Sequence, residues 1–254
     1  MKQSFSQKHP YRSVFFFGLL CTFMTALGTA IPQIIGLEEE QQLIVTTIFL
    51  IVSVLLGIVI MIRSQYRLAD YGFQITSKEF HHKVLWYAPL VIIEIIPIAL
   101  YGFSSKITAL QYVILACFTI AVGFNEEIYF RGLSLKPMEM KGRKKAIIWS
   151  AVIFGGLHIV NALNGKSTLY LILQMTFAFL VGFVLAEIVC ITKSLWFVII
   201  WHAAHDFISS TTSDTLDSKA LIILGIQVGI LLVYAILIWR KSVEEMPVLA
   251  SVSE

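Results

Sequence analysis

Long blocks of apolar residues alternate with short polar segments along most of the chain. A helix needs about 20 mostly apolar residues to cross a bilayer, and eight blocks approach that length. The eight predicted spans are residues 14–35, 43–62, 84–103, 110–125, 146–160, 169–191, 194–209 and 221–239. The pattern predicts an all-α, polytopic membrane bundle of about eight transmembrane helices. We expect residues 1–254 to form one integral membrane domain.

Positive charge concentrates in alternate segments between these blocks. With the N-terminus placed in the cytoplasm, 16 of the 19 Lys and Arg residues lie in inner segments, and only Lys106, Lys166 and Lys219 lie in outer ones. Cytoplasmic segments of membrane proteins carry an excess of Lys and Arg, so both termini are predicted to be cytoplasmic. The first apolar block follows basic residues as in a signal peptide, but it is long for one, and we expect it to be retained.

The composition excludes several classes of protein. Apolar residues make up 57% and charged residues 14% of the chain, whereas soluble domains carry roughly 25% charged residues. An ordinary cytosolic enzyme is therefore excluded. The net charge of +3 comes from basic residues scattered along segment flanks, so we expect no nucleic-acid partner. The three cysteines lie inside apolar blocks without a regular spacing and are expected to be buried small residues.

Ionisable residues inside spans are costly and usually functional. The first cluster of them is Glu126, Glu127 and Arg131. Glu127 and Arg131 are four residues apart and share a helix face, so they can pair. Glu126 is rotated by about 100° from Glu127, and it remains the unpaired carboxylate. In an apolar cavity, such a group is a useful proton acceptor near neutral pH. The alternative is a charge cluster at a helix end on the membrane surface.

A second polar position is His158, which follows Phe154, Gly155 and Gly156 in the fifth block. A single histidine on an apolar face is more often structural than catalytic. The two glycines permit the close approach of another helix or of a substrate backbone. A site role for His158 is favoured only because the other two clusters also supply acid–base side chains.

The third cluster is His202, His205 and Asp206 in the seventh block. His202 and Asp206 are four residues apart and point the same way, while His205 lies about 60° from His202 around the helix. A histidine and a carboxylate on one face suit metal ligation or a hydrogen-bonded catalytic pair. The alternative is a polar clasp between helices. Three such clusters on separate segments favour one shared site.

Two isolated carboxylates receive structural interpretations. Glu94 lies between Pro89 and Pro97, and we expect it to be protonated or bonded to backbone groups that a proline frees. Glu187 lies near the inner end of its block, and we expect it to reach the membrane interface.

The three clusters resemble the signatures of the CPBP family of intramembrane endopeptidases, the Abi or CAAX-protease-like group related to type II CAAX prenyl endopeptidases. The family pattern is E-E-x-x-x-R, F-x-x-x-H and H-x-x-x-N/D in this order. In this chain the motifs are Glu126-Glu127-x-x-x-Arg131, Phe154-x-x-x-His158 and His202-x-x-x-Asp206. The motif-bearing core covers about residues 110–210. The resemblance implies a bundle with a conical cavity open to the cytoplasm, in which a peptide bond is hydrolysed.

The resemblance also implies roles for individual residues. Glu126 and His158 would activate a water molecule, and His202 and Asp206 would stabilise the oxyanion. An Asn can donate a hydrogen bond to an oxyanion, whereas an ionised Asp cannot. Asp206 would therefore be protonated and donate, or it would orient and charge His202.

The supporting residues and the cofactor follow from the same resemblance. Glu127 and Arg131 would support the site. His158, His202 and Asp206 would make a plausible three-ligand Zn²⁺ site with water in the fourth position. The family has been described both as metal-dependent and as metal-free, and we favour the metal-free interpretation, in which Glu126 is still the base.

Our leading hypothesis is an endopeptidase of the bacterial cell membrane with its active site facing the cytoplasm. It would cleave a small membrane-associated peptide or a lipidated protein. Bacterial members of the family are associated with bacteriocin immunity and peptide maturation, whereas a eukaryotic substrate would be a prenylated tail. One alternative is a non-catalytic immunity or scaffold protein. Another is a proton- or metal-coupled transporter, which inverted repeats would support; the sequence has no evident repeat.

Overall fold

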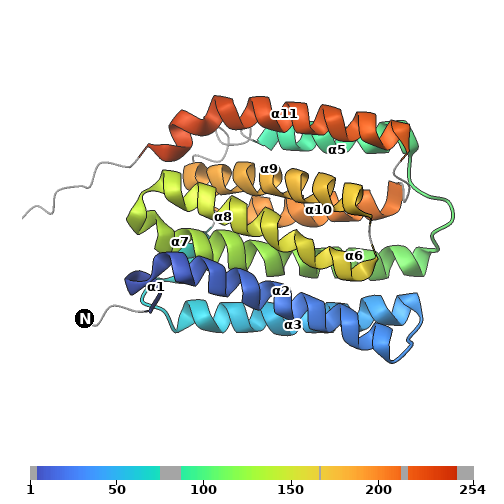
Figure 1. Ribbon diagram of the computed structural model, residues 1–254, viewed down its shortest axis with the longest axis horizontal. Coiled ribbons are helices and arrows are strands. Elements are labelled where there is room, and N and C mark those ends of the chain that lie inside the picture. The colour runs from blue at the N-terminus through green and yellow to red at the C-terminus, as the bar shows by residue number, and fades with distance from the viewer. Residues whose placement is uncertain (1–4, 75–86, 166, 213–216, 245–254) are drawn as a thin grey trace, which may run out of the picture.

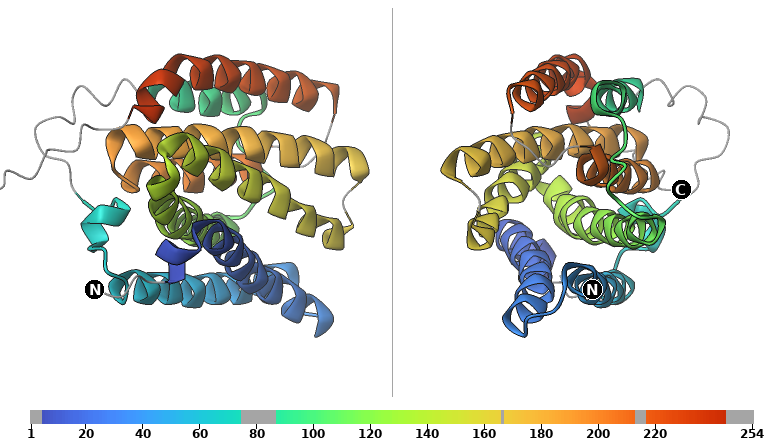
Figure 2. Two further views of the ribbon diagram at one scale, coloured as in Figure 1. Left: turned by 60° about the vertical axis from the view of Figure 1, so that its left-hand side comes forward. Right: turned by 90° about the vertical axis from the view of Figure 1, so that its right-hand side faces the viewer.

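The computed structural model describes residues 5–74, 87–165, 167–212 and 217–244, and this part of the chain is helical and contains no strand. The helices run roughly along one axis in three layers (Figures 1 and 2). One outer layer contains α2 (Pro10–Ile34), which follows the short α1 (Phe5–Lys8), and α3 (Glu39–Ile62). The central layer contains α6 (Ala109–Glu127), α8 (Arg143–Leu157), α9 (Thr168–Thr192) and α10 (Trp196–Thr212). The other outer layer contains α5 (Ala88–Tyr101) and α11 (Ser218–Val243).

Six helical segments of the described chain are long and apolar enough to cross a membrane. They are Pro10–Ile34, Glu39–Ile62, Ala109–Lys141, Arg143–Ala162, Thr168–Thr192 and Ser218–Val243. The predicted spans 84–103 and 194–209 correspond to the shorter helices α5, of 14 residues, and α10, of 17; residues 84–86 lie outside the described part. The all-α membrane class is confirmed, and the number of eight spans stays a prediction.

Three of the long helices begin with a side-chain cap at the same end of the bundle. Thr108 accepts a hydrogen bond from the backbone N–H of Gln111 at the start of α6. Ser167 and Asp217 cap α9 and α11 in the same way. Such caps satisfy N–H groups that have no partner within the helix, so the polar residues between the apolar blocks set where these helices begin.

The helix that carries the first motif continues beyond its predicted end at residue 125. It passes through a π-helical segment, η3 (Ile128–Ser134), then α7 (Leu135–Met138) and η4 (Glu139–Lys141). All residues of η3 are buried. The interpretation of the first motif as a surface cluster at a helix end is therefore wrong. π-helical turns of this kind often occur at functional sites.

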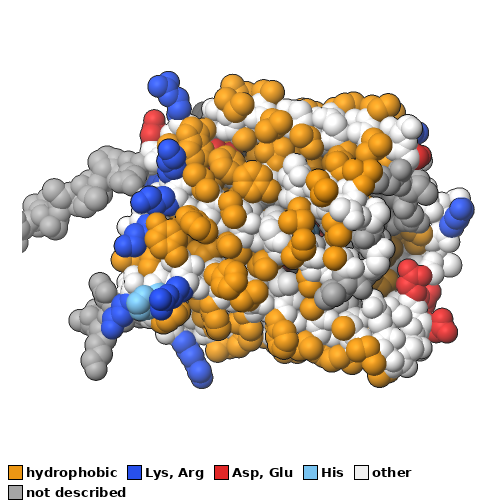
Figure 3. Space-filling model, viewed as in Figure 1, with side chains coloured by type: hydrophobic (Ala, Val, Ile, Leu, Met, Phe, Trp, Pro, Cys, Tyr) orange, Lys and Arg blue, Asp and Glu red, His pale blue; other side chains and the backbone are white. Residues whose placement is uncertain are grey.

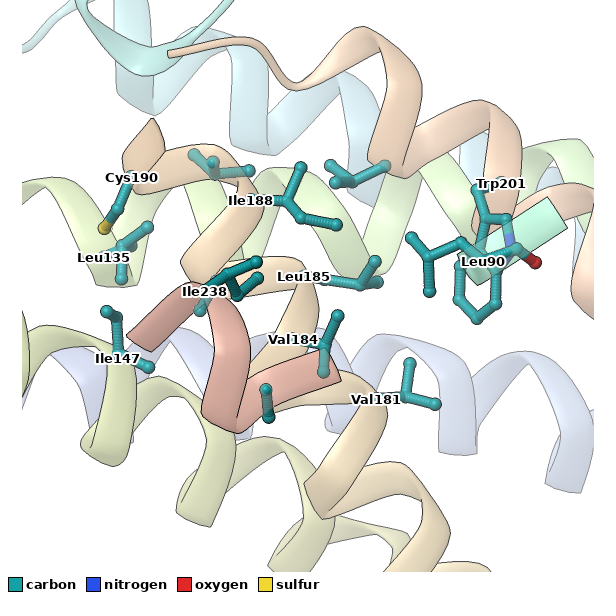
Figure 4. Close-up of a cluster of buried hydrophobic side chains, with 14 of the residues drawn as sticks. Leu90, Leu135, Ile147, Val181, Val184, Leu185, Ile188, Cys190, Trp201 and Ile238 are labelled. Atoms are coloured by element: carbon teal, nitrogen blue, oxygen red, sulfur yellow. The ribbon is translucent and has the colours of Figure 1, made fainter. Parts of the chain in front are cut away.

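A dense apolar core fills the bundle around the second half of α9. Val184, Leu185 and Ile188 project into one cluster with Ile147 of α8 and Ile238 of α11 (Figure 4). Each of these side chains is at most 1% exposed. This core fixes the central helices against one another and so positions the residues of the site.

Charged and apolar side chains are separated along the bundle axis. Lys and Arg side chains gather at the end where the described chain begins and ends, and apolar side chains cover much of the surface beyond them (Figure 3). Many large apolar residues are exposed on the outer helices, as expected for a surface in contact with lipid. We refer to the end that carries most Lys and Arg residues as the basic end.

Glu187 does not reach the membrane interface, contrary to our expectation. It is fully buried, and its Oε1 accepts a hydrogen bond of 3.1 Å from Ser242 Oγ. The last turns of α11 cover this face of α9, a contact between segments 55 residues apart that hydropathy does not reveal.

Candidate active site

The centre of the site is a buried clamp around Glu127. Its Oε1 accepts hydrogen bonds from Arg131 Nη1 at 2.9 Å and from His202 Nδ1 at 2.7 Å. The four-residue spacing predicted the first contact, and α10 supplies the second. The side chains of Glu127 and Arg131 are both 0% exposed, and their opposite charges compensate each other there. The clamp fixes which edge of the His202 ring remains for other partners.

The free edge of His202 faces two further carboxylates. Its Nε2 lies 3.5 Å from Glu126 Oε2 and 3.7 Å from Asp206 Oδ2. Both distances exceed an ordinary N–H···O hydrogen bond, so a small shift or a bridging water is needed to close them. Glu126 and Glu127 thus approach the same imidazole from α6, one at each ring nitrogen.

His158 lies where α8 ends and presents its ring with a defined orientation. Its Nδ1 is 2.8 Å from the carbonyl oxygen of Phe154. Because a carbonyl can only accept, Nδ1 must carry the hydrogen, and the neutral ring then has its lone pair on Nε2. Glu126 and His158 line one cavity of about 70 Å³.

Phe154 separates the groups of the site from one another. Its ring lies edge-on to His158 and to His202, with ring centroids 4.9 and 6.0 Å apart. The Arg131 guanidinium lies over the same ring at 4.2 Å. Sequence reasoning treated Phe154 only as a motif position, although its spacing of four from His158 already indicated a shared face.

A second and larger cavity, of about 260 Å³, adjoins the first at Phe154 and His158. Four chemically active side chains line it, namely His158, His202, His205 and Asp206. The remaining polar lining is neutral and consists of Tyr170, Gln174, Ser209 and Gln227. The structure therefore brings residues of all three sequence clusters to two adjoining cavities.

His205 is fixed by a partner that the sequence did not suggest. Its Nδ1 lies 2.9 Å from Glu94 Oε1 of α5. The ring stacks against Phe177 and Trp201, with centroids 5.4 and 5.2 Å apart. Glu94 therefore belongs to the wall behind the larger cavity. Our expectation that it bonds to backbone groups freed by a proline is wrong.

The backbone group that a proline frees in α5 is satisfied by Gln227 instead. Pro97 has no N–H, so the carbonyl of Ile93 loses its helical donor. Gln227 Nε2 of α11 donates to this carbonyl at 3.1 Å. Sequence reasoning missed Gln227, whose polar side chain in the middle of an apolar block was the available signal.

Only one of the two neighbouring glycines is needed for close packing. A Cβ on Gly155 would lie 2.7–2.8 Å from atoms of Phe179, including its backbone, so α8 and α9 approach each other closely there. A Cβ on Gly156 would meet nothing within 4 Å. The close approach holds His158 beside the larger cavity.

The proposed zinc ligands do not form a ligand set. Among the described residues, no three His, Cys, Asp or Glu side chains are arranged so that they could hold one ion. The Nδ1 atoms of His158 and His202 are both engaged with protein oxygens. The metal-free interpretation, with Glu126 as the base, stays a prediction.

Residues 108–208 match the family model described as type II CAAX prenyl endopeptidase Rce1-like. This segment runs from the cap of α6 into α10 and contains Glu126, His158, His202 and Asp206. No curated protein matches the chain. The segment that contributes these four residues is an Rce1-like domain of the CPBP family.

Proposed function

We propose that this protein is an intramembrane endopeptidase in which Glu126 and His158 activate the water that attacks a peptide bond. The observation that carries the proposal is that Glu126, His158 and His202, from three separate helices, surround two adjoining cavities inside an apolar bundle. Membership of the Rce1-like family supports a protease at the level of the family. Lipid-facing apolar helices make membrane lipid its surroundings, and its substrate is a peptide or a lipidated protein.

The first step is the attack of water on the carbonyl carbon. Water in the smaller cavity donates one hydrogen bond to the Glu126 carboxylate and the other to Nε2 of His158, which is the acceptor because Nδ1 is bound to Phe154. As the new C–O bond forms, Glu126 takes a proton from the water and acts as general base. The tetrahedral intermediate then collapses, the C–N bond breaks, and the same proton passes from Glu126 to the leaving amine.

The negative oxygen of the intermediate requires a donor, and His202 supplies it. Its Nδ1 donates to Glu127, so the imidazolium form has one remaining N–H, at Nε2. The ring lies near three carboxylates and one guanidinium, and an imidazolium there reduces the net negative charge. A donor fixed in place before the reaction stabilises developing charge without reorganisation.

Asp206 acts on the same oxyanion side. Its Oδ2 is 3.7 Å from His202 Nε2, close enough to orient the ring and to favour its charged form. In its protonated form, Asp206 donates a second hydrogen bond to the oxyanion. Replacement by Asn preserves donation and removes the charge, so activity retained in Asp206→Asn indicates the donor role.

The test uses purified protein in detergent and a pool of peptides that includes one with a farnesylated cysteine followed by three residues. We expect the wild-type protein to cleave members of this pool and Glu126→Gln to cleave them about 10²–10⁴-fold more slowly. Mass spectrometry of the products identifies the bond. Equal cleavage by the variant, or no cleavage of any peptide by the wild-type protein, would contradict the proposal.

A further inference from the structure

The larger cavity lies in one half of the bundle. On α9 its lining residues run from Tyr170 to Ala178, in the half where the helix begins, with Val181 next to the midpoint. On α11 the lining residues Leu224 and Gln227 also belong to the beginning of the helix. α9 and α11 begin at the end opposite the basic end (Figure 1).

The basic end is distant from the larger cavity. α8 begins at Arg143, and the rise of 1.5 Å per residue places His158 about 22 Å further along the bundle. α11 carries Arg240 and Lys241 in its last turn, well beyond Gln227. Figure 3 shows this separation, because Lys and Arg side chains gather at the end away from the first turns of α9 and α11.

Packed side chains close the path from the basic end to the site. Leu133, Leu135 and Met138 are at most 2% exposed. The backbone N–H of Leu195, just before α10, donates to the carbonyl of Gly72 at 3.0 Å and ties a loop over this region. A cavity between Lys136, Lys193 and Arg131 of the clamp measures only about 30 Å³. In contrast, Ser209 lines the large cavity and is exposed at the surface.

We propose that the cavity receives its substrate from the non-cytoplasmic side of the membrane. The excess of Lys and Arg places the basic end in the cytoplasm, and the cavity opens away from that end. This inference reverses our expectation, drawn from the family resemblance, of a site open to the cytoplasm. The side of entry does not depend on the proposed peptidase function, whereas the class of substrate rests on it.

The side of entry narrows the class of substrate. The substrate is a peptide, or a segment of a membrane protein, that is already exposed on the outer face. The neutral polar lining suits an unmodified peptide backbone. Gln174 and Gln227 each have one atom bonded to the protein, and their remaining amide groups and the Ser209 hydroxyl include both donors and acceptors. A lipidated tail on the cytoplasmic leaflet is on the wrong side of the membrane to enter.

Cysteine labelling in bacterial spheroplasts tests the side of entry without requiring activity. Ser209→Cys places a thiol at the mouth, Gln174→Cys places one on the wall, and Lys144→Cys is the control at the basic end. The background carries Cys117→Ser, since Cys117 is exposed whereas Cys21 and Cys190 are buried. The probe is a membrane-impermeant maleimide, applied before and after permeabilisation.

We expect Ser209→Cys to be labelled in intact spheroplasts and Lys144→Cys only after permeabilisation. Gln174→Cys should follow Ser209→Cys at a lower rate because it is less exposed. The opposite pattern, or labelling of both end positions from the same side, overturns the proposal. Variants are first checked for a single symmetric peak in detergent gel filtration.

The same labelling in a Glu126→Gln background separates the two proposals. An unchanged pattern with no peptide cleavage by the otherwise wild-type protein would contradict the peptidase proposal and leave the side of entry intact. Cleavage of peptides together with a reversed labelling pattern would contradict the proposed side of entry and leave the peptidase proposal intact.

Discussion

The two halves of the bundle use similar apolar sequences in different ways. On α9, residues 180–192 are buried except for Phe183 and Ile191, whereas no residue from 170 to 177 is buried. The first stretch belongs to the dense core near the basic end, and the second borders the large cavity. Hydropathy alone does not distinguish the two stretches. One half of the molecule is thus packed to hold the helices in place, and the other half is hollowed.

Glu126 and Glu127 lie side by side on the boundary between these halves. Glu127 is enclosed with Arg131 and has no exposed surface, whereas the Glu126 side chain is 19% exposed and lines a cavity. Their different surroundings favour different roles for two identical side chains. The first serves the architecture of the site, and we propose that the second serves the chemistry.

Exchanging the two carboxylates for amides should give the largest contrast. We expect Glu126→Gln to lower the rate of peptide cleavage by about 10²–10⁴-fold, the typical contribution of a general base, with an unchanged melting temperature. Glu127→Gln should lower the melting temperature because Arg131 loses its buried counter-charge. Rates on a cleaved peptide and thermal unfolding in detergent measure both effects. Equal changes in cleavage rate and melting temperature in the two variants would contradict different roles for Glu126 and Glu127.

Removing the guanidinium of the clamp should destabilise the packed half of the bundle. Arg131→Met leaves Glu127 as a buried carboxylate without its cation and should cost about 3–5 kcal/mol in free energy of unfolding. Arg67→Met is the matched control, because the Arg67 side chain is 83% exposed and its pair with Asp70 spans 3.5 Å. Such a surface pair contributes about 0–1 kcal/mol. Equal losses in the two variants, measured by denaturation in detergent, would contradict a buried, stabilising clamp.

Substitutions at two neighbouring glycines test the close contact between α8 and α9. Gly155→Ala should cost about 1–3 kcal/mol, as overpacking does, since its Cβ meets the backbone of Phe179. Gly156→Ala meets nothing and should be neutral or slightly stabilising, because an alanine is favoured over glycine in a helix by about 0.5–1 kcal/mol. The difference in melting temperature between the variants is the readout. A greater loss for Gly156→Ala would mean that the two helices pack differently.

The smallest expected effect is that of metal removal. Because the described His, Cys, Asp and Glu residues form no three-ligand set, we expect a strong chelator to leave peptide cleavage unchanged. Activity lost in the chelator and restored by added Zn²⁺ would show that the site rearranges to bind an ion, and the roles assigned to His158 and His202 would have to be revised.

The spacing of residues along the sequence predicted the features that lie within single helices. The all-α class followed from the apolar blocks, and the contact between Glu127 and Arg131 followed from their spacing of four. The partners of His202 and His205 did not, since Glu127 is 75 residues from the first and Glu94 is 111 residues from the second. Such contacts depend on how helices pack. A single sequence with lipid-facing apolar surfaces does not determine that packing.

The central claim is that Glu126 and His158 act together on one water molecule. A double-mutant cycle on peptide cleavage tests it most directly, with Glu126→Gln, His158→Gln and the double variant compared with the wild-type protein. Residues that act as a unit give strongly non-additive losses, so we predict that the double variant is scarcely less active than the weaker single variant. Losses that multiply would show that the two residues act independently and would contradict the claim.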